Sequence, residues 1–380
     1  MFGIGTRGGG NVVAVADIDS GSAGVAIIAF GDTPKLLAFA REDLPLEKRS
    51  DDALSKAIVQ AFATAAEKAA SEYRGEGSPK RIAQCYCVLG TPWTQSYAGE
   101  AFSHFERETV VTDDMIGTLA KQSLADQKEI DPKELLEANV VRVLLNGYPT
   151  GTPAGKRADE IRIFTLLSGC RSDIKSQMQE VLMRTFPETP IMWRSGARAI
   201  LRAAGIDDAE QAVIAMVSAE ATDIIVVRKG ILAERALIPN GVRQIASSFA
   251  EGKPVEETIT LLDMLEKEQC ETDACKALEE SIAKIEPELA KSFGETLAKL
   301  SVSRKLPDQM ILIAAPQMAG WFSRFFARID FTQFTVSTRP FSVSLLSVAG
   351  LSGLPDKDPR LAADPGLAVA SSLVNIEMHS

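Results

Sequence analysis

The sequence has little histidine and few aromatic residues. Its 380 residues include only His104 and His379, and the aromatic share (Phe, Trp and Tyr) is 6%. Two histidines cannot supply a histidine-rich metal site. A Ser-His-Asp triad would have to use one of these two positions. The shortage of histidine therefore excludes a histidine-rich metal site and limits a Ser-His-Asp triad to His104 or His379.

The five cysteines follow neither a zinc-binding nor a disulfide spacing. Cys85 and Cys87 alternate within a predicted strand, Cys170 is isolated, and Cys270 and Cys275 lie in a polar segment predicted to be helical. Proteins of the reducing cytosol keep such thiols free. The pattern predicts unpaired cysteines and a cytoplasmic protein.

Long apolar runs and an excess of basic residues are also missing. No apolar run approaches the ~20 residues that cross a bilayer, and residues 1–11 lack the apolar core of a secretory signal. The formal net charge of −10 opposes binding to nucleic acid. We expect a globular chain of two or more domains, with no nucleic-acid partner and no direct membrane insertion.

Two stretches of the chain repeat one order of predicted elements. In the first, residue patterning predicts three strands, a helix and a strand, at residues 12–18, 23–30, 35–41, 51–73 and 81–89. The second has the same order at residues 212–217, 222–228, 231–237, 242–250 and 309–314. A turn of small residues follows the first strand each time, at residues 19–22 and 218–221, and residues 216–219 correspond in position to residues 19–22. The repeat predicts an internal duplication.

The remaining segments are predicted to form an insert, a helical part and the end of the chain. Within residues 99–189 we expect strands at 104–111, 139–145 and 159–167 and helices at 112–127 and 172–186, which is a small α+β insert. A strand and a helix follow at 191–193 and 196–204. Heptad-like apolar positions predict charged helices within residues 255–300. Residues 317–328 and 366–378 are predicted helices, and residues 334–337 a strand.

Four motifs carry a resemblance to a known family. Residues 19–25 (DSGSAGV) are similar to the first phosphate motif of the actin-like ATPases, and residues 218–224 (SAEATDI) to the second motif of the PilM type. Residues 230–241 and 361–374 resemble the segment after that motif and the closing helix. The chain therefore resembles the actin-like ATPase superfamily, specifically its PilM/FtsA group, which serves type IV pilus assembly and cell division.

The resemblance implies an α/β class and a duplicated actin-like (ribonuclease H-like) fold. Two β-β-β-α-β-α halves would carry an SHS2-type α+β insert and a helical subdomain. The implied division gives residues 10–98 and 338–380 to the first half and 99–189 to the insert. Residues 190–241 and 306–337 would form the second half, and 242–305 the helical subdomain.

The resemblance also implies where ATP and Mg²⁺ would bind. Nucleotide contacts would come from the first motif, the second motif and an adenosine motif near the end of the chain: Asp19, Gly21, Ser22, Ser218, Glu220, Thr222, Asp223 and Ala315. Asp19 would hold the Mg²⁺.

The same motifs depart from the family pattern. Met216 stands where a second metal-binding aspartate is expected, and Ser218 stands where the pattern has glycine. Ala315 and Pro316 replace part of a glycine run. A thioether is a poor Mg²⁺ ligand, and a Cβ obstructs close backbone approach to phosphate. We expect degenerate motifs, weak or absent binding of ATP and Mg²⁺, and a weakened or absent ATPase activity.

The resemblance favours a cytoplasmic scaffold of a type IV pilus or secretion assembly. It would lie at the inner membrane by binding the short cytoplasmic tail of a partner protein, because residues 366–380 contain no Lys or Arg to attract anionic lipid. The groove for that tail is expected beside Thr91, Trp93, Ile161 and Ile163.

Other functions stay open from the sequence. The alternative is an active Mg-ATP-binding ATPase of the same group that polymerises or switches with nucleotide; homo-oligomers or filaments also stay open. A small-molecule kinase on this fold would need a catalytic aspartate that the sequence does not offer.

Overall fold

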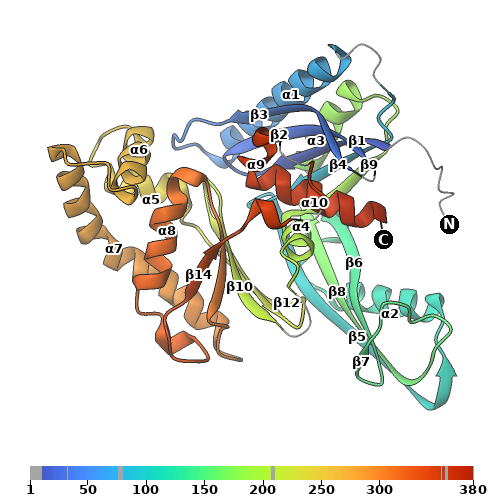
Figure 1. Cartoon of the computed structure of the whole chain (residues 1–380). Helices are drawn as coiled ribbons and strands as arrows, with labels where there is room; N and C mark the ends of the chain where they lie inside the picture. The colour runs from blue at the N-terminus through green and yellow to red at the C-terminus, as the bar shows by residue number, and fades with distance from the viewer. Residues whose placement is uncertain are drawn as a thin grey trace.

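The structure is a computed structural model that describes residues 11–31, 33–75, 80–206, 210–351, 353–355 and 358–379. It contains two five-stranded sheets, an insert with a sheet of its own, and helices packed around them (Figure 1). Among the described residues, no helix is both long and apolar enough to span a bilayer.

The first sheet has the strand order β3-β2-β1-β4-β9. Its strands are β1 (Asn11–Ile18), β2 (Ser22–Phe30), β3 (Lys35–Asp43), β4 (Gln84–Leu89) and β9 (Ile191–Ser195). The first three are antiparallel, and β4 and β9 run parallel to β1. Both faces of β1 are buried, because helices cover the sheet on both sides.

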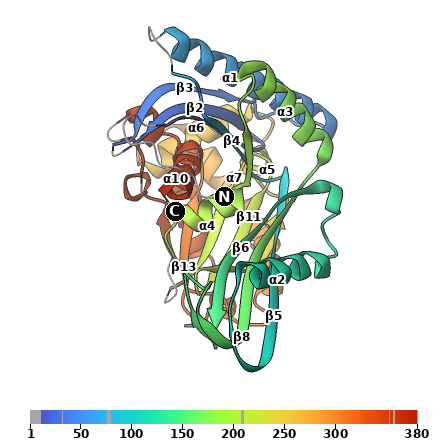
Figure 2. The same cartoon turned by 90° about the vertical axis from the view of Figure 1, so that its right-hand side faces the viewer.

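Alternate side chains of β1 face different helices. Val12, Ala14 and Ala16 share a core with α1 (Asp51–Gly75) and α3 (Ser172–Thr185). Val13 and Val15 share another with α4 (Gly196–Ala203) and α10 (Pro365–His379). Figure 2 shows α1 and α3 together on one side of this sheet.

The second sheet repeats the order of the first, as β12-β11-β10-β13-β14. Its strands are β10 (Gln211–Val217), β11 (Thr222–Arg228), β12 (Ile231–Ile238), β13 (Gln309–Ile313) and β14 (Ser342–Leu345). As in the first sheet, three antiparallel strands are followed by two parallel ones. The predicted duplication is confirmed.

The helices of the second half enclose a core rich in aromatic rings. They are α5 (Val242–Phe249), α6 (Val255–Glu266), α7 (Asp273–Leu300) and α8 (Pro316–Arg328). Trp321 of α8 stacks on Phe325 with ring centroids 5.0 Å apart and meets Phe249 edge-on at 5.5 Å. The predicted helical part is therefore packed onto the second sheet.

Two expectations about this part of the chain are wrong. Residues 334–337 do not form a strand: Thr332–Phe334 is a short 3-10 helix, η2, and Thr335 Oγ1 donates to the carbonyl oxygens of Thr332 and Arg339. Side-chain hydrogen bonds of this kind favour a turn over a strand. Cys270, in the loop after α6, is joined by a disulfide to Cys275 in the first turn of α7, with Cα atoms 6.1 Å apart, so these two cysteines are not unpaired as expected.

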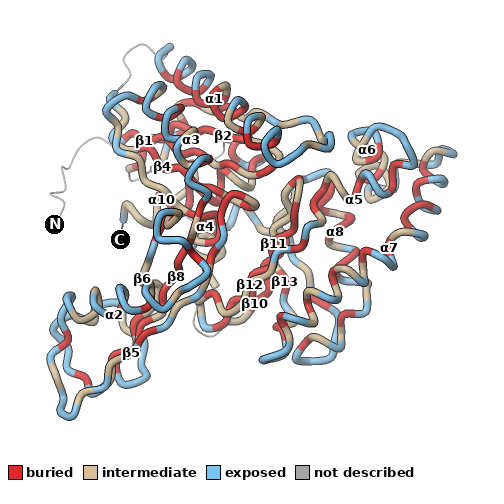
Figure 3. The backbone as a smooth tube through the Cα atoms, turned by 180° about the vertical axis from the view of Figure 1, so that it is seen from behind, coloured by how far each residue is buried: buried red, intermediate tan, exposed pale blue. Residues whose placement is uncertain are grey.

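The insert is an α+β unit with the sheet order β5-β8-β6-β7. The strands are β5 (Thr94–Val110), β6 (Leu135–Leu145), β7 (Tyr148–Pro149) and β8 (Arg157–Cys170), and α2 (Asp113–Asp126) packs on them. Thr112 caps α2 by accepting from the Met115 backbone N–H at 3.3 Å. The outer end of the insert is mostly exposed, whereas the strands nearer the two halves are buried (Figure 3).

Strand pairing differs from the expected division in three places. β9 pairs with β4, so residues 191–195 complete the first sheet instead of opening the second half. β14 pairs with β13, so residues 342–345 belong to the second sheet. β5 begins at Thr94, ahead of the expected start of the insert. A parallel partner cannot be identified from local patterning alone.

Candidate functional site: the cleft between the two hairpins

The first candidate phosphate hairpin joins β1 to β2. Asp19 Oδ1 accepts hydrogen bonds from the backbone N–H groups of Gly21 at 2.5 Å and Ser22 at 3.0 Å. Trp93 Nε1 donates to the Asp19 carbonyl at 2.7 Å. Burial is the main cause that raises the pKa of Asp19. The Asp19 carboxylate therefore stabilises the β1–β2 turn by accepting hydrogen bonds from backbone N–H groups of that turn.

The second candidate hairpin joins β10 to β11. Ser218 Oγ donates to the Ala221 carbonyl at 2.9 Å and accepts from the Ala221 N–H at 3.3 Å. The start of α5 packs directly behind this turn, where the N–H groups of Val242 and Arg243 donate to the carbonyls of Ser218 and Ala219. Hydrogen bonds within the turn and to the start of α5 thus fix the second hairpin to its own half.

The two hairpins touch each other. Ser20 Oγ donates to Ser218 Oγ at 3.0 Å and accepts from the Glu220 backbone N–H at 3.0 Å. A Cβ added at Gly21 would lie 2.7 Å from the Ala219 Cβ, which is closer than van der Waals contact. Residues about 200 positions apart therefore fill the space between the hairpins.

The other motif residues of the second half also have partners. Glu220 forms a two-pronged ion pair with Arg243 at 2.7 and 2.6 Å and accepts from Gln244 Nε2 at 3.0 Å. Thr222 Oγ1 donates to the Asn240 carbonyl at 2.7 Å. These groups hold the hairpin against α5.

Asp223 is buried in an ion pair with Arg235 of β12. Arg235 Nε donates to Oδ1 at 2.8 Å and Nη2 to Oδ2 at 2.7 Å. Thr91 Oγ1 also donates to Oδ2 at 3.0 Å, and Arg235 reaches the Thr94 carbonyl at 3.3 Å. Asp223 thus ties the second half to the corner at which the insert begins.

Arg41 gathers the acidic residues of the first half. Its guanidinium donates to Asp17 at 2.8 Å, to Asp364 at 2.5 and 2.8 Å and to Ser22 Oγ at 2.6 Å. Asp364 also caps α10 by accepting from the Leu367 N–H at 3.0 Å. Burial raises the pKa of Asp17 to about 6, because one guanidinium cannot offset several buried carboxylates.

Comparisons with known proteins find the architecture but no relative in sequence. No protein-family model and no curated protein matches the chain. The structure is similar to the PilM–PilN type IV pilus biogenesis complex, with a TM-score of 0.60 and 12% identity over 95% of this chain and 98% of that one. The chain has the actin-like ATPase fold.

Two further solved structures match more loosely. The ethanolamine utilization protein EutJ from Carboxydothermus hydrogenoformans has a TM-score of 0.44 and 12% identity, over 96% of this chain and 89% of that one. The Aquifex aeolicus PPX-GPPA enzyme has a TM-score of 0.36 and 10% identity, over 97% and 92%.

The residues of the actin-like cleft do not fit a nucleotide as they are placed. A phosphate between the hairpins would need free backbone N–H groups, but those of Gly21, Ser22, Glu220 and Ala221 already donate to protein oxygens. The Gly21–Ala219 contact leaves no gap for a phosphate between the two turns. No step of ATP chemistry can be derived from this arrangement.

The expected site residues fall into three groups in the structure. Those of the two hairpins, from Asp19 to Ser22 and from Ser218 to Asp223, come together as expected. Ala315 is the exposed N-cap of α8, two residues after Ile313, which pairs with Met216 at the end of β10. The four expected groove residues are buried, at 7% or less exposure: Thr91, Trp93, Ile161 and Ile163. They cannot form an open wall.

Sequence reasoning missed the residues that occupy the cleft. Ser20 lies inside the first motif, yet only its distance to Ser218 shows its role. Arg41 and Arg235 lie on β3 and β12, where a charged residue is normally read as solvent-facing. Each is only partly exposed, yet each stands beside acidic residues of its own strand, Glu42 and Asp43 on β3 and Glu234 on β12. The local sequence therefore gives no signal that separates these two arginines from solvent-facing ones.

Proposed function

We propose that this chain is an actin-like scaffold of the PilM type, that its cleft does not use ATP, and that it acts by binding another protein. The observation that carries the proposal is the direct contact of the two hairpins through Ser20, Ser218 and the Glu220 N–H. In the actin-like fold these hairpins would hold the phosphates between them. Here side chains of the protein join the two halves instead.

Opening the cleft for a nucleotide would cost several interactions at once. The Ser20 hydrogen bonds would break, and Asp19 would have to release two backbone N–H groups. Each hydrogen bond contributes about 0.5–1.5 kcal/mol, and an unsatisfied buried group costs more. A nucleotide would have to offset that total before it gained any affinity.

The partner is proposed to be an inner-membrane protein with a short cytoplasmic segment. The support is the likeness to PilM, whose solved structure is a complex with PilN. The protein would be cytoplasmic and would lie at the membrane only through this partner. The basic residues that could bind lipid are absent from the last helix, α10, and its apolar residues pack on the first sheet.

A groove that suits an extended segment runs between β5 and β12. It has a volume of about 420 Å³ and is lined by Gln95, Tyr97, Glu129 and residues 232–237. β5 and β12 are both edge strands of their sheets. Edge strands offer unpaired backbone groups to an added strand. We propose this groove, instead of the buried residues expected from the sequence, as the tail site.

Calorimetry with ATP and Mg²⁺ tests the cleft, after the purified protein has been checked for bound nucleotide. We expect no heat of binding and a thermal midpoint unchanged within about 1 °C. Binding of a ligand to the folded state must raise the midpoint. A Mg²⁺-dependent rise of several degrees would therefore overturn the proposal and favour the ATPase alternative.

A gain-of-binding variant sharpens the test. Met216→Asp with Ser218→Gly restores the family pattern and removes the hydroxyl that accepts from Ser20; Ala219→Gly then relieves the contact with Gly21. We expect measurable ATP affinity only in these variants. Met183→Asp with Ser176→Gly, which makes the same exchanges on exposed positions of α3, is the matched control.

A photo-crosslinking residue tests the groove in cells. Placed at Tyr97 it should capture one inner-membrane protein through its cytoplasmic segment. Tyr148, which is 77% exposed at the end of the insert, is the control position. Capture of the same proteins from both positions would remove the groove from the proposal.

A further inference from the structure

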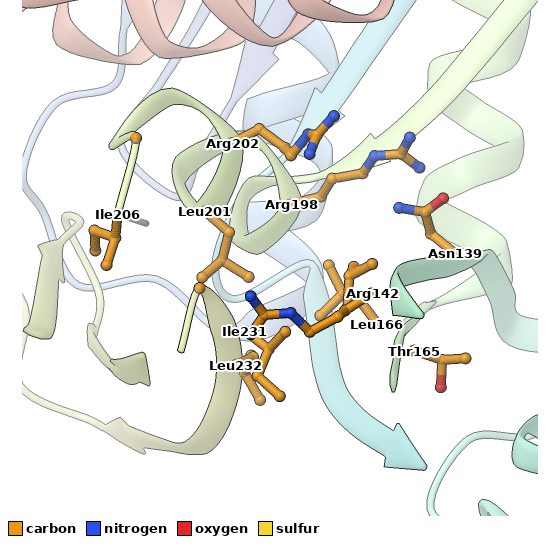
Figure 4. Close-up of a pocket in the computed structure, with 13 residues that line it drawn as sticks. Asn139, Arg142, Thr165, Leu166, Arg198, Leu201, Arg202, Ile206, Ile231 and Leu232 are labelled. Atoms are coloured by element: carbon orange, nitrogen blue, oxygen red, sulfur yellow. The ribbon is translucent and has the colours of Figure 1, made fainter. Parts of the chain in front are cut away.

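A second pocket lies where the insert, the first half and the second half meet. Its walls come from β6 and β8 of the insert, from α4, and from the turn between β11 and β12 (Figure 4). Its volume is about 290 Å³, at the small end for ligand pockets. None of its lining residues belongs to the two hairpins, so it is separate from the cleft.

The pocket has an apolar floor and a basic edge. Leu166, Leu201 and Ile231 are among the apolar residues that line it, and Arg142, Arg198 and Arg202 lie around them. In Figure 4, Arg142 extends from the insert toward Leu201 and Ile231, and Arg198 points from α4 toward Asn139. The pocket therefore offers apolar contact and guanidinium donors side by side.

The charge of this pocket runs against that of the whole chain. The net charge is −10, yet the described lining residues include three arginines and no carboxylate. Arg198 is paired with Glu137 at 2.9 Å and Glu377 at 2.7 Å. Arg202 has no ion-pair partner among the residues that the structure describes. An anion beside Arg202 would therefore meet a guanidinium that no described carboxylate neutralises.

The guanidinium of Arg142 is another hydrogen-bond donor at the pocket, and a backbone carbonyl positions it. Its guanidinium donates to the carbonyl oxygen of Lys229, in the turn between β11 and β12. Partial burial of its guanidinium lowers the pKa of Arg142. Guanidinium groups in such surroundings favour a carboxylate or phosphate that accepts two hydrogen bonds.

We propose that this pocket binds a small organic anion: one carboxylate or phosphate on an apolar group no larger than a leucine side chain or a phenyl ring. The anion would lie at the arginines and the apolar group against Leu166, Leu201 and Ile231. The ligand would contact the insert and both halves at once. Its binding would therefore fix their arrangement and, with it, the groove between β5 and β12.

Two matched pairs of probes test this with the intact protein: N-acetylleucine against N-acetylleucinamide, and phenyl phosphate against benzyl alcohol. Binding is followed by ligand-observed NMR at low and at 0.5 M salt. We expect each anion to bind at least about tenfold more tightly than its neutral counterpart and to weaken at high salt. The pair with the larger ratio separates a carboxylate from a phosphate ligand. Equal binding within both pairs, or no binding below 10 mM, would overturn the proposal.

Variants locate the site. Arg202→Gln should weaken the anions about five- to tenfold, Arg202→Lys should retain most of the affinity, and Leu201→Trp should abolish binding by filling the pocket. Arg107→Gln, an exchange at an exposed arginine of β5, is the control. An equal loss in the control would show non-specific attraction and refute the site. If Leu201→Trp does not fold, the two exposed Arg202 variants decide. The nucleotide result has no bearing on this outcome, so the two proposals fail separately.

Discussion

Removing the guanidinium of Arg235 should destabilise the protein strongly. Arg235 and Asp223 are 11% and 3% exposed and are joined by hydrogen bonds of 2.7 to 3.0 Å. Arg235→Met keeps most of the side-chain volume but leaves the carboxylate buried with only Thr91 beside it. Breaking a buried pair from one side costs about 3–5 kcal/mol. We expect a loss of that size.

The double variant separates the ion pair from the other contacts. Asp223→Asn with Arg235→Met removes both charges and leaves a neutral amide next to Thr91. It should lose only about 1–2 kcal/mol, because no unpaired charge stays buried. The coupling between the two sites should therefore exceed about 1 kcal/mol.

Urea unfolding followed by tryptophan fluorescence and by circular dichroism measures these losses. Coincident transitions are required for a two-state free energy. Arg81→Met is the control, because Arg81 and Glu188 form an exposed pair at 3.6 Å and should contribute less than about 0.5 kcal/mol. A loss below about 1 kcal/mol for Arg235→Met, or an equal loss in the double variant, would refute the assignment. Asp223 would then be free for another role, such as the nucleotide contact implied by its motif.

Three further predictions concern stability. Asp17 has a pKa of about 6 in the folded state against 3.8 when unfolded, so between about pH 4 and 6 only the folded state holds a proton on this carboxyl. This group should therefore lower the free energy of unfolding by about 2–3 kcal/mol as pH rises through that range. Urea titrations of Asp17→Asn should lack this component. Thr112→Ala removes the cap of α2 and should cost about 1 kcal/mol in the same assay, whereas Thr112→Ser should cost little. Cys270→Ser should cost about 2 kcal/mol without reductant, from the loop of 5 residues that the disulfide with Cys275 closes. With dithiothreitol it should match the wild type; a difference that persists would assign the loss to packing.

The duplicated fold could be predicted from the sequence because its signals are local. Continuous apolar runs mark β1 and β10, and small residues mark the turns after them. The strand predicted at residues 334–337 is wrong because the prediction used only local residue types. Its aromatic and β-branched residues suit a strand, but Phe331 and Phe334 pack against the core from a turn.

The contacts that fill the cleft could not be predicted in this way. Ser20 and Ser218 are 198 residues apart, and Arg41 and Asp364 are 323 apart. Such pairs depend on how whole sheets are placed relative to one another. The prediction that Ile161 and Ile163 line an open groove was wrong because alternate residues of a strand face opposite sides of the sheet. Ile161 and Ile163 alternate with Arg162 on β8 and are fully buried, while Arg162 points to the outer side with Glu100.

Ser218 changes the meaning of the motif to which it belongs. In sequence it is a lost glycine, which removes room for a phosphate. In the structure its hydroxyl accepts from Ser20 and donates to Ala221, so the same substitution supplies a bond between the halves. In an actin-like cleft with a bound nucleotide the ligand would join the halves; here hydrogen bonds between protein groups join them directly. The proposed scaffold would gain from this arrangement, because the shape of its groove between β5 and β12 would not depend on the nucleotide supply.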